Sequence, residues 1–340
     1  MKLLFIYILL FVLSSECFSH AFESNTNIEE IKKEDKIRIR EAMRISEFID
    51  DKIWRDWSSA PFLLILVLDK TEYLFTENDK SLPEGFEYLE FDSITERHIF
   101  FRPRIFDKEM LATFPAVDGI PTIVTGNPEN TSLNSMQWVI TILHEHFHQL
   151  QQSRTDYYSS VNNLGLAGED NSGMWMLNYN FPYDDEKVSD MYGKLVIEAA
   201  EIYDRKVTNI SDSAIEYYLN LKDSLKKMLI EKDYLYFSFQ LWQEGMAKYT
   251  EIKSAEILSK ENYEYSKEFK ELNDFVSSDS FYSNVLSRLI HNSQNQNLKT
   301  NMRECFYTLG ALEGLLLDKV NPSWRKKYFK EKFFTEKYFK

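Results

Sequence analysis

Three of the six histidines in the chain stand together in the segment His144-Glu145-His146-Phe147-His148. On a helix, residues four apart project only about 40° apart, so the first and last of these imidazoles can reach one metal ion. The carboxylate that follows the first histidine can take a proton from water activated by that ion. This HExxH spacing predicts a metal site on His144 and His148 with Glu145 as the general base.

The residues on either side favour a buried helix for this segment. Residues 138–143 are apolar except for Thr141, and Phe147 and Leu150 continue the apolar pattern. A strand is the alternative, because its alternation would place His144 and His146 on one face. One or two of the histidines could also be core residues satisfied by hydrogen bonds. The periodic pattern from 135 to 152 leads us to predict the helix.

A third protein ligand must come from elsewhere in the chain, because catalytic zinc sites use three. The next histidine is distant, at His291. A helical segment at 241–251 offers Glu244 beside Gly245 and Ala247, whose small side chains let the helix approach a neighbour closely. Glu244 is therefore the candidate third ligand.

The same segment contains a second carboxylate, Glu251, about two helical turns after Glu244 and on the same face. It could accept a hydrogen bond from a ligating imidazole and so orient that ring. The alternative for Glu244 is a surface ion pair with Lys248, four residues later.

Together these residues resemble the gluzincin branch of zinc metallopeptidases, as in the aminopeptidase N family. There, HExxH is followed by a helix like this one, and the glutamate before the glycine is the third zinc ligand, which implies Glu244. The family also has a Y-x-x-G motif, which is similar to Tyr307-Thr308-Leu309-Gly310, 63 positions after Glu244. Its tyrosine stabilises the tetrahedral oxyanion, a role that the resemblance implies for Tyr307.

Two features differ from that family. Glu244 lies 96 positions after His148, so a helical insert must fold away and return the glutamate to the site. The entropy of loop closure grows only slowly with length, so such an insert is tolerable. The family's G-x-M-E-N strand, which holds the free amine of the substrate, is matched in part by residues 126–130. This match makes Glu129 a candidate substrate-binding residue, with an ordinary turn as the alternative.

These residues predict a Zn²⁺-dependent peptidase that acts on a peptide or protein substrate. Zinc would be held by His144, His148 and Glu244, and Glu145 would pass a proton from water to the leaving amine. A zinc-stabilised binding protein without turnover is the alternative, and a closed site with His146 as fourth ligand would favour it. A metal-free helical protein with a coincidental HExxH is a third interpretation.

The overall charge of the chain indicates which classes of binding partner to expect. The chain has 340 residues, with 40 Lys and Arg against 54 Asp and Glu, and a net charge of −14. Nucleic-acid binding depends on clustered basic residues, so we expect no nucleic-acid partner. A hydrophobic content of 44% is sufficient for a substantial core. The sequence leaves the oligomeric state open.

The N-terminus has the pattern of a secretion signal. Lys2 precedes an apolar run from Leu3 to Leu13, and the small-residue segment Ser19-His20-Ala21 follows. We predict a signal peptide at 1–21, cleaved after Ala21, and a secreted or periplasmic protein. Eleven apolar residues are too few to cross a bilayer, which needs about 20, so no transmembrane segment is expected.

The rest of the chain divides into three parts that differ in their pattern of apolar and polar residues. Residues 22–57 predict a helical extension, with one amphipathic helix or two, and 58–130 a β-rich part with short β-branched and aromatic runs. Residues 131–340 predict a helical, zinc-binding part, with helices expected at 135–152, 185–208, 213–232, 235–259 and 301–318. The expected fold class is α+β, a small and mostly antiparallel sheet followed by a large helical half, with 58–340 as one catalytic unit.

Overall fold

The computed structural model describes residues 28–78, 82–170, 172–205 and 210–339. Within this part of the chain there are two compact units. Unit 1 contains residues 28–44, 61–139 and 266–275, and unit 2 contains 45–60, 140–265 and 276–339. The boundaries fall inside two helices, α1 (Lys33–Phe48) and α3 (Ser135–Gln152), which therefore contribute residues to both units.

Unit 1 is built on a six-stranded sheet in the order β3-β4-β2-β1-β6-β5. The strands are β1 (Leu64–Val67), β2 (Thr71–Thr76), β3 (Glu87–Asp92), β4 (Arg97–Pro103), β5 (Leu111–Val117) and β6 (Ile120–Gly126). Every neighbouring pair is antiparallel except β1 with β6. The expected mostly antiparallel sheet is confirmed. All residues of β1 and β2 are buried, which explains their continuous apolar and aromatic runs.

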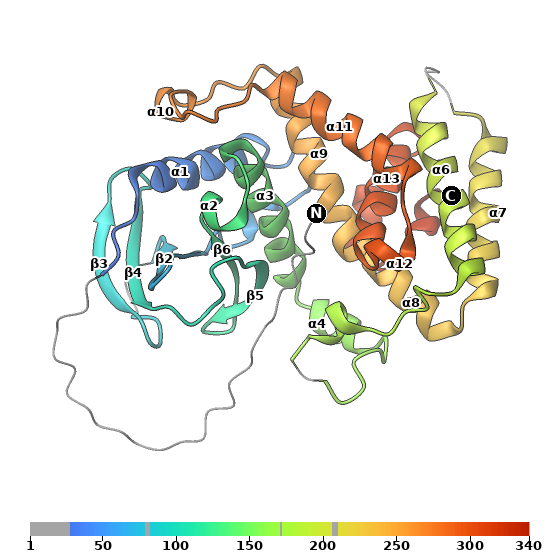
Figure 1. Ribbon diagram of the computed structural model, residues 1–340, viewed down its shortest axis with the longest axis horizontal. Helices are drawn as coiled ribbons and strands as arrows, with labels where there is room; N and C mark the ends of the chain where they lie inside the picture. Colours follow the sequence, from blue (N-terminus) through green and yellow to red (C-terminus); the bar gives the residue numbers. More distant parts are fainter. Residues whose placement is uncertain (1–27, 79–81, 171, 206–209, 340) are drawn as a thin grey trace. The chain divides into compact units, whose positions relative to one another are not determined.

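One face of the sheet holds an apolar core, and α1 runs along the sheet (Figure 1). Lys36 on this helix contacts Asp92 at the end of β3, with 2.6 Å between Nζ and Oδ2. Two short helices, α2 (Pro128–Thr131) and α10 (Lys267–Lys270), complete unit 1. The core residues are Leu63, Ile65, Val67, Leu74, Phe86, Phe100, Met110, Val117 and Val124.

A carboxylate in unit 1 holds the first residue of α3. The Asp274 carboxylate accepts hydrogen bonds from the backbone N–H and the hydroxyl of Ser135, both at 2.6 Å. These bonds satisfy one of the backbone donors that every helix leaves unpaired at its start. Although burial opposes the effect, the same bonds lower the pKa of Asp274.

Unit 2 is helical. Its longest helices are α6 (Glu186–Asp204), α7 (Asp212–Met228), α9 (Met246–Lys260), α11 (Ser278–Gln294) and α13 (Glu304–Val320). The shorter elements of this unit are α4 (Tyr157–Asn162), α5 (Trp175–Asn178), α8 (Glu231–Gln240), the π turn η2 (Leu241–Gly245), α12 (Leu298–Asn301), α14 (Arg325–Tyr328) and the 3₁₀ turns η1 (Trp57–Ser59) and η3 (Thr335–Phe339). The α6 and α7 helices pack side by side, and α13 packs against α6, η2 and α9 (Figure 1). Of the thirteen residues 305–317 of α13, all except Tyr307 are buried.

A buried ion pair lies among these helices. The Nζ of Lys222 on α7 lies 2.6 Å from Oε1 of Glu313 on α13, and both side chains are almost fully buried. The ammonium also donates to the hydroxyl of Thr335, at 2.8 Å. This network attaches the C-terminal turn η3 to two helices that lie far apart in the sequence.

The α+β fold class is confirmed, and most of the expected helices are present near the expected residues. Residues 28–57 contain a single long helix, α1, followed by turns and the start of the short η1, in which Trp57 is buried. The α11 helix was not among the expected helices: Phe281, Val285 and Leu289 recur at helical spacing, but they stand among many Ser and Asn residues, which are poor helix formers. The division at 22, 58 and 131 stays a prediction.

Two sequence-based expectations concern export. The predicted signal peptide at 1–21 lies outside the described residues. Within the described ranges, no helix combines the length and the apolar character that a membrane crossing requires.

Candidate metal centre

His144, His148 and Glu244 meet in unit 2. The first two lie on α3, one helical turn apart, and the third lies on η2. The two Nε2 atoms are 3.1 Å apart, and Oε2 of Glu244 lies 3.6 Å from Nε2 of His144 and 3.4 Å from Nε2 of His148. Among the described residues, this is the one group of three or more His, Cys, Asp or Glu side chains arranged to hold a metal ion. The predicted HExxH helix and the predicted third ligand therefore come together.

A hydrogen bond behind each imidazole determines which nitrogen faces the group. His144 Nδ1 lies 2.7 Å from Oε1 of Glu251, and His148 Nδ1 lies 2.7 Å from Oε1 of Gln151. Both partners are oxygen acceptors, and the amide nitrogen of Gln243 also lies 3.2 Å from Nδ1 of His148. Because the contacts with the oxygens are shorter, we assign the proton of each neutral ring to Nδ1. In this tautomer, the Nε2 atom of each ring has a lone pair that faces the other ring. A metal ligand needs such a lone pair.

This arrangement fits a tetrahedral ion. Two lone pairs and a carboxylate oxygen that converge at 3.1–3.6 Å repel one another unless a cation or a proton lies between them. With metal–ligand bonds of about 2.0–2.1 Å, the donors of a tetrahedral zinc site lie about 3.3 Å apart. The separations of 3.1–3.6 Å bracket this value, so the spacing of the three donor atoms fits such an ion.

Glu244 reaches the group because of a local irregularity in its helix. Residues Leu241–Gly245 form a π turn between α8 and α9, a feature that is frequent at functional sites. Gly245, the last residue of this turn, packs directly on Gly310 of α13. A Cβ atom built on either glycine would lie 2.5 Å from the Cα of the other. The absence of both side chains therefore lets α13 approach the turn that carries the ligand.

The charged side chains of this site shift the pKa values of one another. The hydrogen bonds with Glu244 and Glu251 overcome the effect of burial and raise the pKa of His144 to about 10. Burial opposes ionisation of Glu251, but the Lys248 ammonium and the His144 hydrogen bond lower its pKa to about 2. The pKa of Glu244 is likewise well below its usual range despite burial, because of the two histidines. Without a metal, a proton on His144 thus offsets the carboxylates, and a divalent cation would replace that proton.

Tyr307 lies beside the group because Gly310, three residues later on α13, makes the close contact with η2. Its ring stacks on that of His144, with the ring centroids 6.1 Å apart and an angle of 14° between the planes. Burial and the charge of Glu244 raise the pKa of Tyr307 well above its usual value, so the phenol stays protonated. Nη1 of Arg303 donates a hydrogen bond of 2.7 Å to the Tyr307 hydroxyl.

The other two residues of the histidine segment have different surroundings. Glu145 is buried, and its charge contributes to the raised pKa of His144, so its carboxylate lies near that imidazole. His146 is absent from the ligand group. It bonds Gln149 through Nδ1, at 2.7 Å, and packs edge-on against Trp57. Burial lowers its pKa to about 4, so the ring is neutral, and the described structure contains no closed site with His146 as fourth ligand.

Glu129 belongs to unit 1, whereas the metal ligands belong to unit 2. The side chain of Asn127 caps the single helical turn of α2, so Glu129 lies on helical backbone rather than on the strand that the resemblance implies. Its carboxylate pairs with Lys32 at 3.1 Å on the surface. Its role in substrate binding stays a prediction.

Two residues of this site were missed by the sequence reasoning. Gln151 could have been found as the residue one helical turn after His148, with an amide to orient that ring. Arg303 stands one turn before Tyr307, but no motif in the sequence distinguished it from the other arginines.

Comparison with known proteins gives no relative: no family model matches the chain, and neither curated proteins nor solved structures match it. The site itself is therefore the basis for assigning a function.

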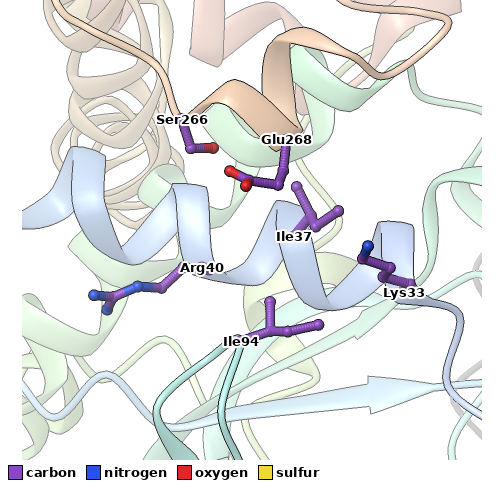
Figure 2. Close-up of a pocket in the computed structure, with 6 residues that line it drawn as sticks. All are labelled: Lys33, Ile37, Arg40, Ile94, Ser266 and Glu268. Carbon is purple, nitrogen blue, oxygen red and sulfur yellow. The ribbon is translucent and has the colours of Figure 1, made fainter.

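A separate concavity lies in unit 1, between α1, the β3–β4 turn and α10 (Figure 2). Its volume is about 350 Å³, and its charged side chains do not form a metal-ligand group. Arg40 at its wall pairs with Glu96, at 2.9 Å. The lining residues are Lys33, Ile37, Arg40, Ile94, Ser266 and Glu268.

Proposed function

We propose that this protein is a zinc-dependent hydrolase that cleaves amide bonds in peptides or proteins. The observation that carries the proposal is the convergence of two imidazole Nε2 atoms and the Glu244 carboxylate within 3.1–3.6 Å, beside the general base expected from HExxH. The similarity of these motifs to the gluzincin metallopeptidases supports the same assignment.

Zinc is the metal that this donor set suits. Two neutral imidazoles and one carboxylate form the His₂Glu set of catalytic zinc sites, in which a fourth position stays open for water and substrate. Calcium and magnesium prefer more oxygen ligands, so this set does not suit them. His146 faces Trp57 and Gln149, so the fourth position is not filled by the neighbouring histidine.

Zinc, when bound, supplies Lewis acidity that makes water nucleophilic near neutral pH and polarises the substrate carbonyl. The chain's own residues then handle protons and orientation. Glu145 accepts a proton from the attacking water and later donates it to the leaving amine. Tyr307, kept neutral by its surroundings, donates a hydrogen bond to the oxygen on which negative charge develops. Glu251 and Gln151 hold the two imidazoles in place.

The signal-peptide pattern at the N-terminus supports a secreted or periplasmic location, where the substrates would be extracellular peptides or proteins. The strongly acidic composition argues against nucleic acid as a partner. The alternative of a zinc-stabilised binding protein without turnover does not need a carboxylate at position 145, which is why we favour the enzyme.

Metal content tests the proposal first. The purified wild type is compared with Glu244→Ala and Glu145→Gln by elemental analysis after dialysis. We expect about one zinc per wild-type chain, a large loss in Glu244→Ala and full retention in Glu145→Gln, because the second variant removes a base and keeps all ligands. Zinc-free wild type, or zinc that does not depend on Glu244, would contradict the ligand assignment.

Activity is tested next, on a randomised peptide library analysed by mass spectrometry. The wild type should release products and Glu145→Gln should be slower by a factor of about 10²–10⁴, the usual contribution of a general base. A protein that binds zinc as expected but cleaves no peptide would favour the binding-protein alternative.

A further inference from the structure

Arg303 is the cationic side chain next to the metal group. Within the described part of the chain, no carboxylate forms an ion pair with its guanidinium, and its hydrogen bond to Tyr307 uses one of five N–H donors. The side chain is mostly buried. A mostly buried guanidinium normally pairs with a carboxylate or phosphate, because removing the charge from water is costly.

The surroundings of Arg303 are neutral phenols. Its positive charge acts on the pKa of Tyr183 and of Tyr236, so both hydroxyl groups lie near the guanidinium, as does that of Tyr307. Burial is the main cause that raises the pKa of all three, which keeps them uncharged at neutral pH. They offer hydrogen bonds but no compensating negative charge.

The negative charge of Glu244 contributes to the raised pKa of Arg303. In the proposed function, the Glu244 carboxylate is a zinc ligand. With the metal bound, the charges nearest the site are two positive from zinc, one positive from Arg303, and one negative each from Glu244 and Glu145. Glu251 is already balanced by Lys248. The net charge of this group is positive, so it attracts an anionic substituent on the substrate.

We propose that Arg303 binds a carboxylate of the substrate, so that the enzyme selects peptides with a carboxylate near the scissile bond. This inference rests on the proposed function for the identity of the ligand. The carboxylate is either the free C-terminus of a peptide or the side chain of Asp or Glu, since both present the same planar acceptor to the guanidinium fork.

The experiment measures binding rather than turnover. Zinc-loaded full-length Glu145→Gln protein is equilibrated with randomised N-acetyl tripeptide libraries, and the retained peptides are quantified by mass spectrometry. One library has free C-termini and a second has C-terminal amides. Two further amidated libraries contain one fixed Glu or one fixed Gln, which separates the side-chain source from the C-terminal source.

We expect retention of one carboxylate class over its matched amide by about 10- to 100-fold, the factor typical of a hydrogen-bonded charge pair. Adding Arg303→Gln to the same protein should bring this ratio close to one. Because the ratio compares two ligands on one protein, a general loss of affinity does not change it. Arg288→Gln, which removes the same charge from an exposed position on α11, is the matched control and should keep the ratio.

Equal retention of acids and amides, a preference that persists in Arg303→Gln, or no retained peptide at all would overturn the proposal. Zinc content and library cleavage are measured on the wild type in parallel. Peptide cleavage without a carboxylate preference would contradict the proposed role of Arg303 and would still support the proposed hydrolase. If the protein bound no zinc, the proposed hydrolase function would be contradicted. The ratio of acid to amide peptides retained by the metal-free protein would still test the role of Arg303.

Discussion

Replacement of Gly310 by alanine tests whether the glycine contact between α13 and η2 shapes the metal site. The new Cβ would lie 2.5 Å from Cα of Gly245 and 2.8 Å from the carbonyl oxygen of Leu241. Carbon atoms pack at about 3.5–4.0 Å, so the two backbones must separate by about 1 Å or more. Both obstacles are backbone atoms, and no side-chain rotation can relieve the contact.

The expected change in the free energy of unfolding of Gly310→Ala is the difference between two opposed effects. Overpacking of this kind costs about 1–3 kcal/mol, while alanine in place of glycine inside a helix returns up to about 1 kcal/mol. We expect a net destabilisation of about 1–2 kcal/mol and a melting temperature lower by several degrees. Zinc–ligand bonds tolerate displacements of only about 0.2 Å, so a shift of Glu244 by about 1 Å should weaken zinc binding tenfold or more.

Gly193→Ala provides the matched control. This glycine lies inside α6, and a Cβ atom there would meet nothing within 4 Å. The same substitution should therefore stabilise the protein by up to about 1 kcal/mol and leave zinc affinity unchanged. Thermal unfolding and zinc titration against a competing chelator measure both quantities. If Gly310→Ala matched Gly193→Ala in stability and zinc affinity, the proposed role of the close contact would be refuted.

Three further predictions concern charged side chains. Glu251→Gln should lower zinc affinity by about 10- to 100-fold, because it weakens the bond that orients His144, and an unchanged affinity in the chelator titration would contradict that role. Lys222→Ala should cost about 3–5 kcal/mol in chemical denaturation, because the buried carboxylate of Glu313 loses its cation and keeps only the hydroxyl groups of Tyr218 and Thr335 as donors. The double variant Lys222→Met/Glu313→Leu should be clearly more stable than this single one, and equal instability would exclude the buried charge as the cause. Asp274→Asn should cost about 1 kcal/mol at neutral pH, where the ionised carboxylate holds the start of α3. Because folding lowers the pKa of this aspartate, its contribution is complete above its unfolded pKa of about 3.9 and is lost as the pH falls through the lower folded value. The difference from wild type should therefore shrink in acid unfolding curves below about pH 4, and a constant difference would argue against an ionic role.

The parts of the fold that the sequence could predict are those set by local patterns. The α3 helix has a continuous apolar periodicity, and the structure begins and ends it at the predicted residues, Ser135 and Gln152. The mostly antiparallel sheet was indicated by short β-branched runs between turn residues. By contrast, α11 was not predicted although Phe281, Val285 and Leu289 recur every four residues, because the Ser and Asn residues between them favour turns and helix caps over helix interiors.

The site was predictable to a different extent at each residue. His144 and His148 share one helix, so their spacing alone brings them together. Glu244 comes from 96 positions further on, and it was singled out by small neighbours and by resemblance. The π turn that aims it was not foreseeable, since residues 235–259 have the pattern of one continuous helix. The contact of Gly245 with Gly310 depends on tertiary packing, which no local pattern encodes.

The separation of the metal ligands along the chain has a consequence for the folding of the insert. His148 and Glu244 enclose nearly a hundred residues, including α4 to α8, and an ion bound between them would act as a reversible cross-link across that loop. Cys305 is the sole cysteine among the described residues, so no disulfide fastens this region. An ion that binds only the folded chain stabilises it by about 2.7 kcal/mol at a hundred times its dissociation constant. Availability of the metal would thus control how firmly the insert is held, and a chelator would expose its helices to proteases before it unfolded the sheet.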